Sequence, residues 1–380
     1  MIERTLKEEL LRVSKHFPVS ILTGPRQSGK TTLCKMAFPN YKYVNLENPD
    51  TREMIINDPM SFLRNNPNGM ILDEAQRYPE LFSYLQVIVD EDKSLRFVLS
   101  GSNNFILMEK ITQSLAGRAA LMTLLPLSVA ELRPTQSTDE MMFRGFYPAV
   151  WGDGQQPYDV YSNYYRTYIE RDLQQLINIK DLDLFRQFVR LMASRVANEF
   201  NASHISNELG IDVKTAQHWL SILTTSYIAF TLPPYYRNIG KRIIKAHKLY
   251  FFETGLVTYL LGIESAEQVA THPLRGALFE NMVVSEFYKR RFNQGKTPHL
   301  FFYRDNAQKE VDLIEEQSFD QLYTYEIKSA KRYNTQFAAG LDYFRKLYGS
   351  KVLDGEIIYD GVEQVESNGY TCRNWQLAVL

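Results

Sequence analysis

The sequence predicts an α/β protein in which a helix-wrapped parallel sheet is followed by a mostly helical region and then by a second α/β region. Short apolar runs at residues 44–46, 70–72 and 97–99 alternate with helical segments, as expected for parallel strands that are covered on both faces. Apolar residues at helical spacing dominate the next part of the chain, and strand-like runs return near its end. We expect three domains, at residues 1–155, 156–255 and 256–380.

A glycine-rich loop with the sequence GPRQSGKT fits the pattern GxxxxGK[ST] and lies between a strand-like run and a helical segment. Glycines allow backbone N–H groups to turn inward around phosphates, and a helix N-terminus adds a positive field. We expect Lys30 to reach the β- and γ-phosphates and the Thr31 hydroxyl to ligand Mg²⁺. ATP and Mg²⁺ are therefore the predicted ligands. The predicted phosphate-binding residues are Gly24, Pro25, Arg26, Gln27, Ser28, Gly29, Lys30, Thr31 and Thr32.

Two acids follow the apolar run at residues 70–72. At the C-terminal end of a strand, Asp73 can hold Mg²⁺ through water, and Glu74 can polarise an attacking water. An ordinary strand that ends in solvated acids is the alternative. A third strand-like run ends in small polar side chains, of which Ser102 is the first candidate for sensing the γ-phosphate and Asn103 the second. Together with the glycine-rich loop, these residues predict ATP hydrolysis.

Composition and charge limit which partners, metal sites and cellular compartments the sequence allows. The formal net charge of the 380 residues is −1, so any surface for nucleic acid has to be a local patch. Cys34 and Cys372 are far apart and lack the spacing of metal ligands, which favours a reducing compartment without structural zinc. The N-terminal segment is charged and amphipathic, and no apolar stretch is long enough to span a bilayer. We expect a cytoplasmic protein without membrane contact.

Residues 204–223 form a helix-turn-helix pattern with a tight turn at Gly210. Two strand-like runs follow, at residues 227–232 and 248–252, so that the whole segment predicts a winged helix. The densest basic segment of the chain lies between these runs and begins with two adjacent tyrosines, which suits contact with a phosphate backbone. A protein-binding module or a solvated hairpin is the alternative. The predicted DNA contacts are Arg237, Lys241, Arg242 and Lys245, together with Lys214, Gln217 and His218 on the second helix.

The glycine-rich loop, the segment LDEAQ at residues 72–76 and the segment LSGS at residues 99–102 resemble the AAA+ ATPase superfamily of the P-loop NTPase (ASCE) class. The chain resembles most the prokaryotic ATPases in which an AAA+ module is joined to a DUF4143 domain. This resemblance implies a ring or other homo-oligomer, in which a neighbouring subunit completes each site with an arginine. Arg118 is the first candidate for that arginine and Arg171 the second, and an internal salt bridge is the alternative role. Supporting segments lie at residues 114–118, 145–148, 168–173 and 252–256.

The elements expected near the end of the chain resemble the PD-(D/E)xK nuclease fold. An amphipathic helix carries Glu280, a hairpin carries Asp312, and the next strand carries Glu326 and Lys328 on one face. The resemblance implies that Asp312 and Glu326 chelate Mg²⁺, that Lys328 orients the attacking water, and that Glu280 completes the metal shell. The proline that names the motif is absent, and such folds also serve as binding modules. Cleavage and an inert domain therefore both remain open.

The sequence predicts a Mg²⁺-dependent, ATP-hydrolysing AAA+ protein that acts on DNA by remodelling, branch migration or structure-dependent processing, with nuclease activity as an addition. The alternative is a nucleotide-gated regulatory switch or partner-binding ATPase whose nuclease-like domain is inactive. A metabolic nucleotide kinase is poorly supported, because no segment resembles a lid over a small substrate.

Overall fold

The computed structural model describes residues 2–66, 68–101, 114–152, 154–172, 181–236, 245–318 and 321–379. Contacts divide the chain into two compact units. The first unit contains Met1–Leu127, Thr225–Tyr227 and Arg291–Lys296, and the second contains Ser128–Thr224, Ile228–Arg290 and Thr297–Leu380. Residues 128–155, which the sequence analysis placed in the first domain, thus belong to the second unit.

The first unit is built on a parallel five-stranded sheet with the order β2-β3-β4-β1-β5. The strand that leads into the glycine-rich loop, β1, is separated from the strand that ends in Asp73, β3, by the intervening strand β4. This is the strand order of the predicted ASCE class of P-loop NTPases, and the α/β fold class is confirmed. The strands are β1 (Val19–Thr23), β2 (Lys42–Asn45), β3 (Met70–Asp73), β4 (Phe97–Ser100) and β5 (Ala119–Thr123).

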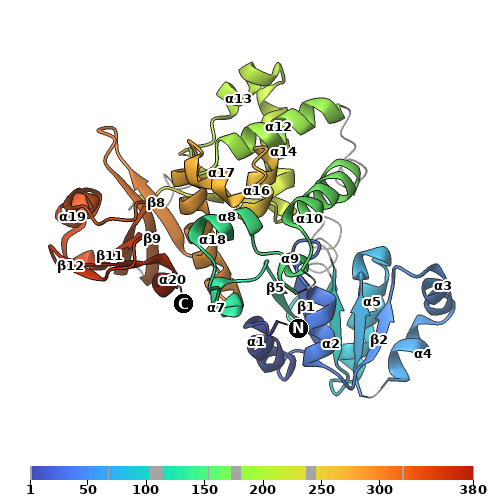
Figure 1. The fold of residues 1–380 in the computed structure, drawn as a ribbon. Coiled ribbons are helices and arrows are strands. Elements are labelled where there is room, and N and C mark those ends of the chain that lie inside the picture. The colour runs from blue at the N-terminus through green and yellow to red at the C-terminus, as the bar shows by residue number, and fades with distance from the viewer. Residues whose placement is uncertain are drawn as a thin grey trace. The chain divides into compact units, whose positions relative to one another are not determined.

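Helices cover both faces of this sheet (Figure 1). Helices α1 and α2 pack on one face around Leu10, Leu33 and Val98, and α3, α4 and α5 pack on the other around Ile55, Leu63 and Leu85. Because each strand is covered on both sides, its residues are apolar without alternation. The helices are α1 (Leu6–Ser14), α2 (Lys30–Ala37), α3 (Pro49–Asn57), α4 (Pro59–Arg64) and α5 (Leu81–Glu91), with a 3₁₀ turn η1 (Ala75–Arg77).

The last strand of this sheet is followed by an apolar run that is not itself a strand. β5 ends at Thr123. Leu124, Leu125 and Leu127 are buried although they follow the strand. Leu124 still donates its backbone N–H to the carbonyl oxygen of Thr23 at 2.8 Å, and Pro126 then has no N–H with which the ladder could continue. The apolarity of Leu125 and Leu127 reflects packing and not strand pairing.

The second unit begins with a helical region that contains the predicted helix-turn-helix. Gly210 ends α13 in the left-handed conformation (φ 66°), which a residue without Cβ adopts at little cost. The two strands predicted after it are present and pair in antiparallel fashion as β6 and β7. The elements are α7 (Val129–Leu132), α8 (Thr138–Arg144), α9 (Pro148–Gly152), α10 (Pro157–Tyr164), a π-helix η2 (Tyr165–Asp172), α12 (Leu182–Ser194), α13 (Ala202–Leu209), α14 (Val213–Thr225), β6 (Ala229–Leu232), β7 (Lys248–Phe251), α16 (Thr254–Leu260) and α17 (Ala266–Thr271).

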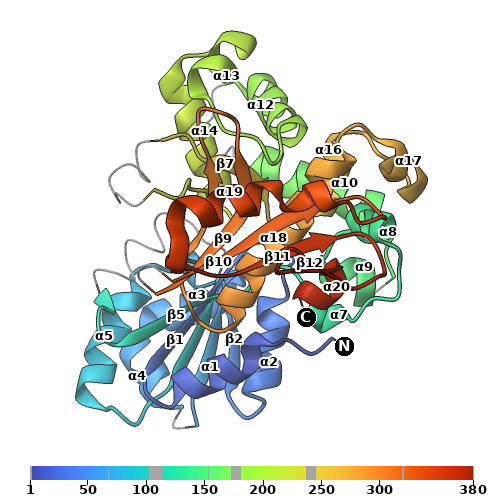
Figure 2. The same ribbon diagram turned by 90° about the vertical axis from the view of Figure 1, so that its left-hand side faces the viewer.

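A six-stranded mixed sheet with the order β12-β13-β11-β10-β9-β8 completes the second unit. Helix α19 packs on one face of this sheet through Leu341 and Phe344. Helix α18 packs on the other face (Figure 2). The centroid of the Phe287 ring lies 4.7 Å from that of the Tyr325 ring. The elements are α18 (Arg275–Asn293), β8 (Leu300–Arg304), β9 (Glu310–Ser318), β10 (Gln321–Lys328), η3 (Thr335–Ala338), α19 (Ala339–Tyr348), η4 (Gly349–Lys351), β11 (Val352–Tyr359), β12 (Val365–Ser367), β13 (Tyr370–Asn374) and α20 (Trp375–Val379).

No helix in the described parts of the chain combines the length and the apolar character needed to cross a membrane.

Candidate functional site

The glycine-rich loop has the shape of a phosphate cradle. A Cβ atom on Gly24 would lie 2.2 Å from the carbonyl oxygen of Leu124, so only glycine fits where the chain leaves β1. Gly29 precedes α2 with φ 92°, which turns the backbone so that the first N–H groups of the helix face the loop. Arg4, a buried residue that the sequence analysis missed, donates to the carbonyl oxygens of Ser28 (2.6 Å) and Leu125 (2.7 Å). It holds the outer side of the loop in place.

The Lys30 ammonium lies inside the loop. It is buried and donates to the carbonyl oxygens of Gly24 (3.0 Å) and Pro25 (2.7 Å). Burial lowers the pKa of Lys30 to about 8, although the nearby carboxylates of Glu74 and Asp73 partly offset this effect. A buried ammonium that donates to neutral carbonyl oxygens favours the arrival of an anion. The loop therefore fits the phosphates of a nucleotide.

Three hydroxyl groups converge on Asp73 at the end of β3. Thr31 donates to its Oδ2 atom at 2.7 Å and Tyr43 donates to the same atom at 2.8 Å, while Ser100 donates to Oδ1. The predicted pair of Thr31 and Asp73 is thus brought together. Tyr43 on β2 and Ser100 on β4 were missed. A hydroxyl beside a carboxylate is the donor set that Mg²⁺ takes at such loops, so these residues fit the predicted ion.

Glu74 occupies the left-handed region of the backbone (φ 55°) directly after β3. For a residue with a side chain this conformation is unfavourable, and such positions cluster at functional sites. The side-chain amide of Gln76 donates to the Glu74 carboxylate. The sharp turn and this hydrogen bond fix the direction of the carboxylate at the edge of the sheet where the glycine-rich loop also lies.

Of the other residues predicted for this site, the structure describes the side chain of Arg118 only. Ser102 and Asn103 lie outside the described residues, as does the side chain of Arg171. Arg118 forms a two-point ion pair with Asp90 on α5 of its own unit, with both N–O distances at 2.7 Å. This pair is the internal salt bridge that the sequence analysis gave as the alternative role.

The C-terminal residues of the nuclease-like pattern also come together. Lys328 Nζ lies 2.5 Å from Glu326 Oε1 and 3.5 Å from Asp312 Oδ2, and Asp312 accepts the backbone N–H of Ile327. Burial raises the pKa of Glu326, and the charge of Asp312 adds to the effect while Lys328 opposes it. Glu326 Oε2 is buried without a hydrogen-bond partner. Three of the four predicted residues therefore form one compact group.

Glu280, the fourth residue, is held by Lys248, the first residue of the second strand-like run after the helix-turn-helix. Lys248 Nζ lies 2.9 Å from Glu280 Oε1 and also forms an ion pair with Glu310. The Tyr250 hydroxyl donates to the same Glu280 oxygen at 2.6 Å. Burial disfavours the Lys248 ammonium, but the surrounding charges, with Glu280 first, outweigh it and raise the pKa of Lys248.

These ion pairs do not fit a bound Mg²⁺. Magnesium takes oxygen ligands in a near-octahedral shell, whereas here ammonium groups occupy carboxylate oxygens of Glu280, Glu326 and Asp312. Among the described residues, no cluster of three or more His, Cys, Asp or Glu side chains is arranged to hold a metal ion. The chemistry of this acidic cluster therefore differs from that of the glycine-rich loop.

The predicted DNA-contact residues are described only in part. Arg237, Lys241 and Arg242 lie outside the described residues. Lys214 and Lys245 are exposed. Tyr235, the first of the two adjacent tyrosines, is buried against the rings of Phe301 and Tyr348 at 5.6 and 5.4 Å. Its predicted position at a phosphate backbone is wrong, because the C-terminal sheet takes it into its core.

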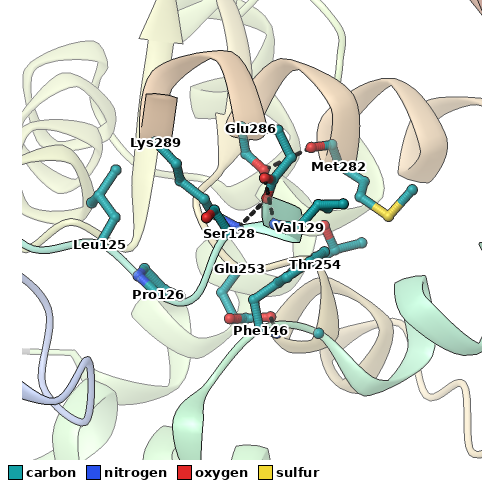
Figure 3. Close-up of polar contacts among 12 residues, drawn as sticks. Leu125, Pro126, Ser128, Val129, Phe146, Glu253, Thr254, Met282, Glu286 and Lys289 are labelled. Atoms are coloured by element: carbon teal, nitrogen blue, oxygen red, sulfur yellow. Dashed lines mark hydrogen bonds and ion pairs between the residues drawn. The ribbon is translucent and has the colours of Figure 1, made fainter. Parts of the chain in front are cut away.

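The segments at residues 145–148 and 252–256 meet in a buried polar cluster of the second unit. Glu253 Oε1 accepts the N–H of Phe146 at 2.8 Å and the Tyr161 hydroxyl at 3.0 Å. Figure 3 shows Glu286 close by, between the Lys289 ammonium (2.7 Å) and the backbone N–H of Val129 (2.8 Å). Burial raises the pKa of Glu253 to about 7. Glu253 therefore has a structural role, since it joins the segment at residues 252–256 to the segment at residues 145–148.

Comparisons with known proteins match three successive parts of the chain. A family model described as "AAA domain" matches residues 16–133, one described as "Domain of unknown function (DUF8612)" matches residues 135–267, and one described as "Domain of unknown function (DUF4143)" matches residues 275–377. The uncharacterized protein Rv2008c of Mycobacterium tuberculosis is 32% identical over 345 residues, which cover 86% of this chain and 74% of that protein. This chain belongs to the family of ATPases that join an AAA domain to a DUF4143 domain.

Further relatives of this AAA–DUF4143 ATPase are more distant. An uncharacterized protein of Haemophilus influenzae is 22% identical over 403 residues, covering 93% of this chain and 95% of the relative. Among solved structures, the Walker-type ATPase PABY2304 of Pyrococcus abyssi is similar with a TM-score of 0.46 and 14% identity, covering 69% of this chain and 96% of that chain. The predicted resemblance to AAA+ ATPases with a DUF4143 domain is confirmed by the family matches.

Proposed function

We propose that this AAA–DUF4143 ATPase hydrolyses ATP with Mg²⁺ and uses the resulting conformational change to remodel DNA. In this proposal Lys30 and the loop amides bind the phosphates, Thr31 and Asp73 hold the metal, and Glu74 orients the attacking water. The group of Lys30, Thr31 and Asp73 supports the nucleotide chemistry, since an ammonium with neutral partners lies beside a hydroxyl and a carboxylate. Nucleotide binding would draw Lys30 away from the loop carbonyls.

The surface around α14 supports DNA as the substrate. One side of α14 is buried through Ala216, Trp219 and Ile222, while Lys214, Gln217 and His218 on the same helix are exposed. A groove of about 400 Å³ lies between α14 and the β6–β7 hairpin, and its lining includes Gln217, Ser221, Lys245 and His247. A concave surface with exposed lysines, amides and hydroxyls suits phosphate and base-edge contacts. This groove is the observation that carries the DNA assignment.

The proposal includes assembly into a homo-oligomer, in which Arg118 completes the site of a neighbouring subunit. That role requires the pair between Arg118 and Asp90 to open, since both guanidinium contacts are made within one unit. The molar mass in solution, measured by light scattering with and without ATP, tests this part. A monomer under every nucleotide condition would remove the Arg118 assignment.

ATP hydrolysis with and without DNA tests the central proposal. Duplex, single-stranded and four-way-junction DNA are added in Mg²⁺, and turnover is expected to rise with at least one of them. The double variant Lys214→Glu/Lys245→Glu is expected to weaken DNA binding and to make the negative slope of log K against log salt shallower by about 2. Lys93→Glu, an exposed lysine on the first unit, is the matched control. DNA-independent turnover with wild-type salt dependence in the double variant would contradict the proposal.

A second candidate is a nucleotide-gated switch that binds a protein partner and has an inert nuclease-like domain. The ion pairs of Lys248 and Lys328 within the acidic cluster favour it, because they compete with a metal for the carboxylates. ATP turnover that no DNA stimulates, together with a nucleotide-dependent protein complex, would support this candidate over DNA remodelling.

A further inference from the structure

The Lys248 ammonium lies deep within the acidic cluster of the C-terminal sheet. Its side chain is 4% exposed, and its Nζ atom contacts carboxylates from two different elements, Glu280 on α18 and Glu310 at the start of β9. Lys248 itself comes from a third element, the first residue of β7. One cation thus joins a strand of the β6–β7 pair, a helix and an inner strand of the six-stranded sheet.

The remaining charges of the cluster are matched in the same way. Lys328 pairs with Glu326 and Asp312, and Arg304 lies 3.6 Å from Glu310. Three cationic side chains therefore face four carboxyl groups. The Tyr250 hydroxyl adds a hydrogen bond to Glu280. This arrangement leaves little uncompensated negative charge for an ion from solution to neutralise.

A divalent cation and this ammonium exclude each other. A metal held by Glu280 and Asp312 would lie within a few ångström of Lys248 Nζ, and like charges at such a distance repel strongly in a buried site. Pairing of β7 with β6 from Lys248 to Phe251 fixes the backbone of Lys248, and its side chain is buried against Glu280 and Glu310. The lysine is therefore an integral part of the cluster.

We infer that Lys248 is a built-in cation that takes the place of a divalent metal ion, so that the acidic cluster is a closed structural site in the wild-type protein. The C-terminal sheet then neither binds metal nor cleaves DNA, and the cluster ties β7 to α18 and β9. This inference does not depend on whether the protein remodels DNA. It concerns the nuclease-like residues alone.

Binding of Mn²⁺ to the full-length protein without nucleotide tests the inference, with electron paramagnetic resonance reporting the free ion. Only the Mn²⁺ binding that Asp312→Asn abolishes is assigned to the acidic cluster, so an ion bound at Asp73 is not counted. Wild type is expected to show no Asp312-dependent binding. Lys248→Met is expected to gain one Asp312-dependent Mn²⁺ site. Its affinity should be at least tenfold above that of any Asp312-dependent binding still detected in the wild type. Lys309→Met, an exposed lysine in the turn before β9, is expected to behave as wild type.

Two further variants keep the inference testable if Lys248→Met does not fold. Lys248→Arg retains the cation and is expected to bind no Mn²⁺ at the cluster. Lys248→Met/Glu280→Gln removes one charge of each sign and is expected to fold and bind Mn²⁺ through Glu310, Asp312 and Glu326. Asp312-dependent Mn²⁺ binding by the wild type would overturn the inference. The inference would also fail if neither Lys248→Met nor Lys248→Met/Glu280→Gln bound Mn²⁺ at the cluster although tryptophan fluorescence showed that at least one of them is folded.

Discussion

Replacing Glu253 by glutamine should change how the stability of the second unit depends on pH. Glu253 Oε1 accepts the N–H groups of Phe146 and Gly255 and the hydroxyl of Tyr161. Burial raises the pKa of Glu253 from 4.5 to about 7. Glutamine has the same shape and keeps an acceptor oxygen at this position, but it never carries a charge.

The sign and size of the effect follow from proton linkage. The folded protein binds the Glu253 proton more tightly than the unfolded chain does, so the free energy of unfolding contributed by this group falls as pH rises through the interval from 4.5 to about 7. The full pKa difference corresponds to about 3 kcal/mol. Because pH 5 already lies above the pKa of the unfolded chain, we expect Glu253→Gln to gain about 2.5 kcal/mol relative to wild type between pH 5 and pH 8.

Urea unfolding followed by tryptophan fluorescence measures this difference in the right part of the molecule. Trp151, Trp219 and Trp375 are the three tryptophans of the chain, and all of them belong to the second unit. Glu264→Gln, which changes an exposed glutamate close in sequence, should leave the pH profile unchanged. A stability difference between Glu253→Gln and wild type that is the same at pH 5 and pH 8 would refute the reasoning.

The remaining predictions concern the nucleotide site. Because the pKa of Lys30 is about 8 in the free protein and phosphate contact requires the ammonium, ATP binding should take up about 0.9 proton at pH 9 and about 0.1 at pH 7. Calorimetry in buffers of different ionisation enthalpy measures this uptake, and equal values at both pH values would contradict it. Tyr43→Phe removes one hydrogen bond to Asp73, worth about 1.5–3 kcal/mol, and should raise the Mg²⁺ concentration for half-maximal turnover at least tenfold, whereas nucleotide affinity without Mg²⁺ should stay unchanged. Superimposable Mg²⁺ titrations would exclude that role for Tyr43. Glu74→Gln should retain ATP binding and lose turnover by a factor of about 10²–10⁴, while Lys30→Ala should lose binding. Equal turnover in wild type and Glu74→Gln would remove the assignment of Glu74.

The parts of the site that the sequence predicts are those that local chain geometry determines. The loop from Gly24 to Thr31 is one continuous segment, and the strand before Asp73 is a continuous apolar run, so spacing alone identifies both. Tyr43 and Arg4 reach the same site from other elements through tertiary packing. No local pattern distinguishes Tyr43 from the other tyrosines, or Arg4 from a charged residue on an exposed helix.

Lys248 and Tyr235 show that local sequence patterns also fail to predict tertiary partners in the second unit. Tyr235 stands at the start of the basic segment that the sequence analysis assigned to phosphate contact, and Lys248 begins the strand-like run that follows this segment. The C-terminal sheet instead buries Tyr235 among aromatic rings and Lys248 among carboxylates. Their partners are all more than thirty residues away in the sequence, so charge and composition in a local window could not indicate burial.

The two lysines at the predicted ligand sites differ in the charges of their partners, and this difference separates the two sites by function. Lys30 is buried against two neutral carbonyl oxygens, and its pKa falls to about 8 because burial outweighs the attraction of Asp73 and Glu74. An anion at the loop would restore the ammonium and relieve that cost. Lys248 is equally buried, but Glu280 and Glu310 compensate its charge within the fold and its pKa rises. The glycine-rich loop is therefore the site that gains from binding a phosphate, whereas the acidic cluster already has its cation.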